Sequence, residues 1–209
     1  MHNYWTVEDI RQARRLNLIE TEYDAEAQEY FATAQEYLGT NVPNGITLEV
    51  GCGYGRLLQI LYRKAISDHK NVLFFGTDSN PAMLDLAIKQ TYELPIMYRL
   101  TTDGFGIGQI VHFVFSYGVM QHNSIENVTR SFRASWRVMH PGSKMCHDCL
   151  DGDSLDAQAS VRHLNGQGVP LFAHRGADII QAAEAASFRF TGVPVSNNRR
   201  KLYEFERLA

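Results

Sequence analysis

The stretch Leu48-Glu49-Val50-Gly51-Cys52-Gly53-Tyr54-Gly55-Arg56-Leu57-Leu58 decides the fold of this 209-residue chain. An apolar, β-prone run over 46–50 ends in glycines at every second position, and an apolar helical pattern follows at once. This order predicts a strand, a tight turn and the start of a helix. Because glycine leaves the backbone open, a ligand can lie against main-chain N–H groups at the N-terminus of that helix.

The spacing of the glycines narrows the choice of ligand. A dinucleotide-binding turn needs G-x-G-x-x-G, but here the third glycine comes one residue early and Arg56 fills the dinucleotide position. A P-loop needs Gly-Lys-Ser/Thr after the turn, which Gly55-Arg56-Leu57 does not provide. The alternative without a ligand is a generic strand–turn–helix, since glycine doublets are common.

Composition and charge are ordinary for a globular chain, with 44% hydrophobic and 21% charged residues. The net charge of −3 argues against nucleic acid as a partner, and the short basic patch Arg199-Arg200-Lys201 is predicted to be solvated strand-edge charge. No apolar run approaches the roughly 18 residues that a membrane span needs, and the N-terminus is not a signal peptide. Three cysteines fit a reducing compartment. We therefore expect a cytoplasmic protein without a membrane or nucleic-acid partner.

Strand and helix patterns alternate from Ile46 onward and predict a parallel sheet. A helical pattern over 6–38 precedes the sheet. The expected strands are 46–50, 71–76, 96–101, 111–117, 144–150, 187–193 and 200–207, and the later helices are 55–66, 80–90, 124–138 and 176–186. The segments 103–109 and 151–175 are predicted as irregular, with turns at 140–142 and 194–198. We expect one domain made of a helical cap (1–40), a core (46–150), an insertion (151–175) and a C-terminal helix and strand pair (176–209).

The pattern acidic–apolar–Gly-x-Gly-x-Gly, with Glu49 in the acidic place, resembles motif I of the class I S-adenosylmethionine-dependent methyltransferases. The resemblance covers residues 30–150 well and the rest by layout. It implies an α/β fold with a doubly wound, Rossmann-like, seven-stranded sheet that is mostly parallel and has an antiparallel last strand. It also implies S-adenosyl-L-methionine as cofactor and S-adenosyl-L-homocysteine as product, held at Glu49, Gly51, Cys52 and Gly53.

Asp78 ends the second predicted strand, and ligands of doubly wound sheets bind at the carboxyl ends of strands. A carboxylate there can accept both hydroxyls of a ribose. The segment 76–84, which includes Ser79, resembles the family segment that does so. The alternative is that Asp78, Ser79 or Asn80 only caps the following helix. After the third strand, the resemblance implies that Asp103 accepts from the adenine amino group beside Gly104, with an Asp-Gly turn as the alternative.

The fourth strand leads into Ser116-Tyr117-Gly118-Val119-Met120-Gln121-His122, which resembles family motif IV. Ser116 is a candidate for bonding the cofactor's carboxylate or a nearby backbone group. His122 is the sharpest catalytic candidate, because an imidazole with a pKa near 6.5 suits a general base at neutral pH. The alternative is a structural histidine that bonds to the main chain.

The fifth strand carries Cys146-His147-Asp148-Cys149, followed by Asp151. Alternate residues face the same side of a strand, so His147 and Cys149 share one side and Cys146 and Asp148 the other. This splits the possible metal ligands, and no second cysteine pair follows, so we expect no metal. One side is expected to be buried and the other to face the active-site end, which makes His147, Asp148 and Asp151 candidates for substrate contact or proton removal.

Aromatic residues precede the sheet: Tyr4, Trp5, Tyr23, Tyr30 and Phe31. In many family members a helical cap covers the cofactor, and an aromatic face attracts the positive sulfonium. Tyr30 is the first candidate for contact with the cofactor. The alternative is that most of these rings only pack the helix onto the sheet.

The sequence therefore predicts a methyltransferase that moves a methyl group to an O or N atom of a small molecule. The insertion 151–175, with His163 and His174, is a second place where acceptor specificity could be built. A phenol or acid acceptor needs its proton removed, for which His122 or His147 could serve. The alternatives are a catalytically inactive cofactor-binding or regulatory partner subunit with the same fold and, less favoured, transfer of a different group from the same cofactor.

Overall fold

The computed structural model describes residues 25–101, 105–166 and 171–209. Helices and strands alternate along the chain much as the sequence predicts. The first half consists of α2 (Ala25–Asn41), β1 (Gly45–Val50), α3 (Arg56–Ser67), β2 (Val72–Asp78), α4 (Pro81–Gln90), β3 (Ile96–Leu100), β4 (Val111–Ser116) and the short 3₁₀ helix η1 (Met120–His122). The second half consists of α5 (Ile125–Val138), β5 (Met139–Leu150), α6 (Leu155–Gly166), α7 (Gly176–Glu184), β6 (Phe188–Ser196) and β7 (Arg200–Arg207).

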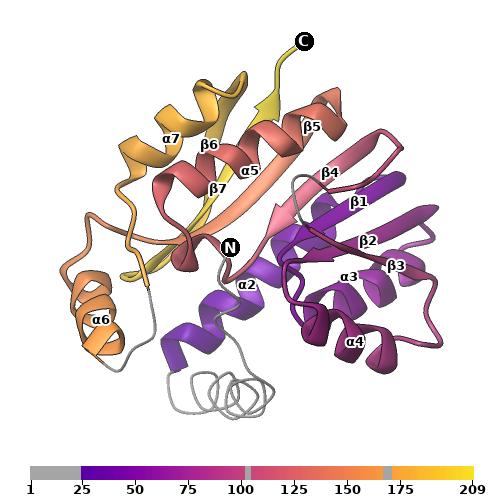
Figure 1. The fold of residues 1–209 in the computed structure, drawn as a ribbon, viewed down its shortest axis with the longest axis horizontal. Helices are drawn as coiled ribbons and strands as arrows, with labels where there is room; N and C mark the ends of the chain where they lie inside the picture. The colour runs from indigo at the N-terminus through magenta and orange to yellow at the C-terminus, as the bar shows by residue number, and fades with distance from the viewer. Residues whose placement is uncertain (1–24, 102–104, 167–170) are drawn as a thin grey trace.

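The strands form one seven-stranded sheet in the order β3-β2-β1-β4-β5-β7-β6. All pairs from β3 to β5 are parallel, whereas β7 is antiparallel to both β5 and β6. Figure 1 shows α3 and α4 on one face of the sheet and α5 and α7 on the other. This is the predicted doubly wound, Rossmann-like arrangement with an antiparallel last strand.

Each face of the sheet has its own apolar core. Phe74, Phe113 and Phe115 pack with residues of α2, α3 and α4, while Phe132 and Phe188 pack with residues of α7 on the opposite face. Since helices cover both faces, strands such as β4 are almost continuously apolar, as parallel strands with two buried faces should be.

The predicted irregular segment 151–175 contains a helix, α6, which corrects the sequence prediction. The Ser154 hydroxyl accepts from the Ala157 N–H at 3.3 Å, which satisfies a donor of the first turn. Buried Leu150, Ala157 and Leu171 form a small apolar cluster under the helix.

The predicted turn at 140–142 lies within β5, whereas the predicted turn at 194–198 is partly right: β6 continues to Ser196, and residues 197–199 connect it to β7. β5 runs through 140–142, where the pairing with β4 shifts register and Gly142 has a φ of 80°. β6 runs through Pro194, which is tolerated because β6 is at the edge of the sheet, where a missing N–H leaves no neighbour unpaired. Glycine and proline were therefore misleading as turn signals at these two places.

None of the helices within the described ranges combines the length and the apolarity needed to cross a bilayer.

Candidate active site

The glycine turn follows β1 at the carboxyl edge of the sheet. Gly51, Gly53 and Gly55 all have positive φ angles, of 72°, 53° and 79°. The N–H groups of Gly51 and Cys52 donate to the Thr77 carbonyl at 2.7 and 2.9 Å. The turn is thus fixed to the end of β2, and its left-handed conformation explains why glycine is needed.

Asp78 is bonded to this turn. Its Oδ2 accepts from the Gly53 N–H at 2.9 Å, and its Oδ1 accepts from the Asn80 N–H at 2.8 Å. The cap of α4 is Asn80, whose side-chain oxygen accepts from the Ala82 N–H at 2.9 Å. Of the three residues considered as caps of this helix, Asn80 is the one that caps it. Each carboxylate oxygen of Asp78 can still accept a hydrogen bond from another donor. Burial raises the pKa of Asp78, although the backbone donors oppose this rise.

Glu49 lies beneath the turn and is buried. Its Oε2 has no hydrogen-bond partner among the described residues. Burial, followed by the nearby Asp78 charge, raises the pKa of Glu49 well above its usual range. Cys52 is also buried, and burial raises the pKa of its thiol. A buried carboxyl oxygen that lacks a partner among the described residues, close to the glycine turn, fits a ligand that brings a donor to this edge.

The other predicted cofactor residues lie in different surroundings. Ser79 is exposed at the start of the β2–α4 connection. Asp103 and Gly104 lie outside the described residues, so their predicted contact with adenine stays a prediction. The same holds for Tyr4, Trp5 and Tyr23 and for the side chain of His163.

Ser116 and His147 face each other on the neighbouring strands β4 and β5. The Ser116 hydroxyl lies 2.6 Å from His147 Nδ1, and both side chains are fully buried. The His147 ring packs against Phe132, with ring centroids 5.0 Å apart. Burial lowers the pKa of His147 to about 3. The imidazole therefore stays neutral at physiological pH and lacks the access to substrate that a general base needs.

His122 ends η1, just after β4, and is half-buried. The segment 171–174 crosses η1 beside it: the Phe172 N–H donates to the Gln121 carbonyl at 2.7 Å. His174 Nε2 lies 2.9 Å from the Asn123 carbonyl oxygen, so it carries a proton there. The segment 151–175, predicted as an insertion, therefore contacts motif IV at the carboxyl edge of the sheet. Of the two histidines predicted as bases, His122 is the one that is partly exposed.

Asp148 forms a buried cluster that the sequence did not reveal. The carboxylate is 0% exposed and accepts from the Tyr30 hydroxyl at 2.8 Å. Arg200 Nε donates to it at 3.1 Å, and Arg200 Nη2 forms a second bond. The Gly118 N–H donates at 3.0 Å. Both sides of β5 are therefore buried here, whereas one side was expected to face the active-site end.

The basic patch of β7 is not solvated strand-edge charge, which corrects the sequence prediction. Arg199 pairs with Glu26 at 3.3 Å and Lys201 with Asp151 at 2.8 Å, while Arg200 pairs with Asp148. Alternation along the strand gave no warning of this, because it puts Arg200 on the same side as Glu204 and Glu206.

Tyr30, the predicted cofactor-contacting ring, is 3% exposed. Burial and then the Asp148 carboxylate raise the pKa of Tyr30 far above its usual range, so the hydroxyl stays protonated as a donor. Its ring lies 6.3 Å from that of Tyr117, centroid to centroid. The position supports packing of α2 onto the sheet, which was the alternative considered for these aromatics.

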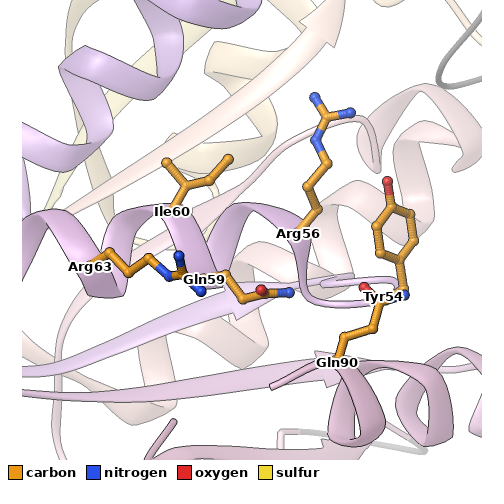
Figure 2. Close-up of a pocket in the computed structure, with 6 residues that line it drawn as sticks. All are labelled: Tyr54, Arg56, Gln59, Ile60, Arg63 and Gln90. Atoms are coloured by element: carbon orange, nitrogen blue, oxygen red, sulfur yellow. The ribbon is translucent and has the colours of Figure 1, made fainter. Parts of the chain in front are cut away.

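A shallow cavity of about 230 Å³ lies on the outer side of α3, between the glycine turn and the end of α4 (Figure 2). Figure 2 shows Arg56, Gln59, Ile60 and Arg63 on α3, Tyr54 on the turn before it and Gln90 at the end of α4. Asp78 and the Gly51–Gly53 turn do not line this cavity, so it is separate from the site at the carboxyl edge.

Comparison with known proteins agrees with this geometry. Residues 48–147 match the family described as "Methyltransferase domain". A search of curated proteins found no match. Magnesium protoporphyrin IX methyltransferase from Synechocystis PCC 6803, with bound S-adenosylhomocysteine, has a similar structure with a TM-score of 0.75, 16% identity and coverage of 98% of this chain and 97% of that chain.

Two further solved structures are similar. A TehB-like S-adenosylmethionine-dependent methyltransferase from Corynebacterium glutamicum has a TM-score of 0.65 and 15% identity, and the match covers 96% of this chain and 97% of that chain. A methyltransferase from Clostridium acetobutylicum has a TM-score of 0.68 and 11% identity, with coverage of 94% and 99%. At these identities the likeness shows the fold.

The sheet order, the glycine turn bonded to Asp78 and the family match over residues 48–147 are those of an S-adenosylmethionine-dependent methyltransferase. The matched core is a methyltransferase domain, and its cofactor is S-adenosylmethionine.

We expect Gly53→Ala to weaken binding of S-adenosylhomocysteine much more than it lowers stability. A Cβ at Gly53 would meet nothing within 4 Å, so within the described chain the substitution costs only the backbone strain, about 1–2 kcal/mol. The new methyl group would instead obstruct a ligand that lies against the turn. Calorimetric titration and thermal unfolding measure the two effects.

The matched control for this substitution is Gly142→Ala. Gly142 also has a positive φ, of 80°, and open space around its Cβ position, but it lies near the start of β5. Gly142→Ala should lose about as much stability as Gly53→Ala does and should bind S-adenosylhomocysteine as tightly as the wild type does. Equal affinities for the two variants would show that no ligand approaches the turn closely.

We expect His147 to make folding stability depend on pH. Because its pKa in the folded state is about 3, below the 6.5 of the unfolded chain, the unfolded state binds more protons between these values. The contribution of neutral His147 to the free energy of unfolding is therefore fully present above pH 6.5. It falls as the pH decreases, by about 1.4 kcal/mol per pH unit. When the pH is lowered from 7 to 5, the free energy of unfolding measured with urea should fall by about 2 kcal/mol more in the wild type than in His147→Gln. An unchanged pH dependence in His147→Gln would contradict the assignment.

Proposed function

We propose that this methyltransferase moves a methyl group from S-adenosylmethionine to an O or N atom of a small-molecule acceptor. The observation that carries the proposal is the hydrogen bond of 2.9 Å from the Gly53 N–H to Asp78 Oδ2. This bond holds a carboxylate at the end of β2 directly beside the open turn after β1, which is the edge where ligands of doubly wound sheets bind.

The residues at this edge suit the cofactor. Asp78 would accept the ribose hydroxyls, since each of its oxygens retains lone-pair capacity. Gly51 and Gly53 would let the cofactor lie against the main chain, with Cys52 between them. Glu49, buried and lacking a partner for Oε2 among the described residues, would accept from a donor of the ligand directly or through water.

When bound, the cofactor supplies an activated methyl group on a sulfonium, which is open to in-line displacement by a nucleophile. The work of the protein is then to position the acceptor and to exclude water. η1 and the segment 171–174, bonded to each other at this edge, would form one wall of the acceptor pocket. The net charge of −3 and the porphyrin named for the Synechocystis relative both favour a small molecule over nucleic acid.

His122 is the candidate base for an acceptor that must lose a proton. It is half-buried at the end of η1, next to the strand-end segment of motif IV. His147, the other predicted base, is fully buried with a pKa of about 3 and bonds to Ser116. The same bond occupies the Ser116 hydroxyl, which reduces its suitability as a ligand of the cofactor's carboxylate.

The first test is calorimetric titration of the protein with S-adenosylhomocysteine, beside Asp78→Ala. Loss of the ribose-binding carboxylate should weaken affinity by roughly tenfold or more, about 1.4 kcal/mol. Asp85→Ala is the matched control, because Asp85 lies exposed on α4, and it should bind as wild type does. Wild-type protein that is folded but binds nothing would contradict the proposed function.

His122→Gln should reduce methyl transfer to phenols by about 10²–10⁴-fold at neutral pH, because a positioned general base contributes that much. Transfer to amines that are already neutral should change little. The measurement is transfer of a labelled methyl group to a panel of phenols and amines, with the affinity for S-adenosylhomocysteine as the control. An unchanged rate for every phenol would exclude His122 as the base.

A further inference from the structure

The cavity on the outer side of α3 has no part in the proposed methyl transfer. Its volume is about 230 Å³, and it is lined by Tyr54, Arg56, Gln59, Ile60, Arg63 and Gln90 (Figure 2). Each of these side chains except that of Ile60 carries a hydrogen-bond donor, and none of the six is acidic. The cavity therefore combines two positive charges with neutral donors, in a chain whose net charge is −3.

The two guanidinium groups of the cavity are not neutralised by the described part of the protein. None of the ion pairs between described residues includes Arg56 or Arg63. The two arginines are separated by two turns of α3, about 10 Å along the helix axis. Gln59 lies between them, within one turn of each. Two cations without a counter-ion, with a neutral donor between them, form a surface that attracts an anion.

An aromatic ring holds the side chain of Arg56. Arg56 Cζ lies 4.2 Å from the centroid of the Phe31 ring on α2, and the Phe31 ring packs edge-on against that of Tyr117, with 5.1 Å between the centroids. A guanidinium over a ring uses its face for this contact, whereas its N–H donors lie in its plane. The contact therefore orients Arg56 and leaves donors for a ligand, so less conformational freedom is lost when an anion binds.

The position of Arg56 on the helix also favours an anion. Arg56 is the first residue of α3, and the first turn of this helix contains no acidic residue. The N-cap, Gly55, has no side chain that could accept from the N–H groups of this turn. A cation at the positive end of a helix dipole is unfavourable, and a bound anion would compensate both charges. This effect adds to that of the two arginines.

We propose that this cavity is a binding site for a small ligand with two anionic groups, phosphate or carboxylate, held by Arg56 and Arg63. The fork of a guanidinium matches both kinds of group, because each accepts two parallel N–H bonds. The separation of the two arginines favours two charged groups over one. The cavity is smaller than the roughly 300 Å³ at which sites for drug-sized molecules begin, which favours a small ligand. This site is additional to that of the proposed function.

The test is calorimetric titration of the wild-type protein with inorganic pyrophosphate and, in a parallel arm, with citrate. Ionic strength is held constant because salt screens exposed charges. We expect saturable binding of at least one of the two, and the tighter ligand identifies the preferred group as phosphate or carboxylate. Inorganic phosphate should bind roughly tenfold more weakly than pyrophosphate, because it reaches only one guanidinium.

The variant Arg56→Gln/Arg63→Gln should bind the tighter anion at least roughly tenfold more weakly, because hydrogen bonds to charged groups are lost. The matched control is Arg130→Gln/Arg137→Gln. These two arginines are exposed on α5, on the other face of the sheet, and have the same spacing along their helix. The control removes the same charge and should bind within about twofold of wild type. Arg63→Gln alone leaves the contact between Arg56 and Phe31 intact and serves if the double variant does not fold.

A second titration uses protein saturated with S-adenosylhomocysteine. The anion should bind equally well, because Asp78 and the Gly51–Gly53 turn do not line the cavity. Displacement of the anion by S-adenosylhomocysteine would place it in the cofactor site and would overturn the inference.

Two further results would overturn the inference. The first is equal weakening in the α5 control, which would show attraction by net charge alone. The second is wild-type protein that binds neither pyrophosphate nor citrate. Protein that binds no S-adenosylhomocysteine contradicts the proposed function instead, and the titration with the anion alone then decides this inference.

Discussion

The burial of both faces of a parallel sheet is the constraint on which the rest of this structure depends. Helices on each side exclude water from the strands, so the strands are free to carry large apolar residues on both faces. Parallel strands also bring all their carboxyl ends to one edge. The turn after β1, Asp78 at the end of β2 and η1 after β4 meet there because the order of strands makes β1 the neighbour of both β2 and β4.

The same burial explains the unusual chemistry of the polar residues near this edge. Glu49, Asp148 and His147 are each at most 3% exposed, and each responds to its surroundings differently. Asp148 has a guanidinium and two further donors, the Tyr30 hydroxyl and the Gly118 N–H. Glu49, with a raised pKa, lies under a turn that is open to a ligand. His147 has a hydroxyl partner and remains neutral.

Two histidines that look equivalent in the sequence therefore differ in their surroundings. His147 lies inside a strand that is covered on both sides, where an imidazolium would lose its hydration without gaining a counter-ion on its own side. His122 lies one short helix beyond the end of β4, where the chain leaves the sheet and borders the segment 171–174. Spacing along the chain carried no information about this difference, because burial is set by elements that are distant in sequence.

The amino-acid sequence by itself determined the order of the elements and the cofactor edge. Apolar runs separated by helical patterns predicted the strands within a few residues. The glycines at 51, 53 and 55 marked the turn, because glycine adopts its positive φ angles without steric cost. The tertiary structure alone decided which polar side chains are buried together. The pairing of Asp148 with Arg200 and Tyr30, the helix over 155–166 and the passage of β6 through Pro194 all depend on neighbours far along the chain. Local sequence patterns encode backbone preference, whereas burial and ion pairing are fixed only when separate segments pack against one another.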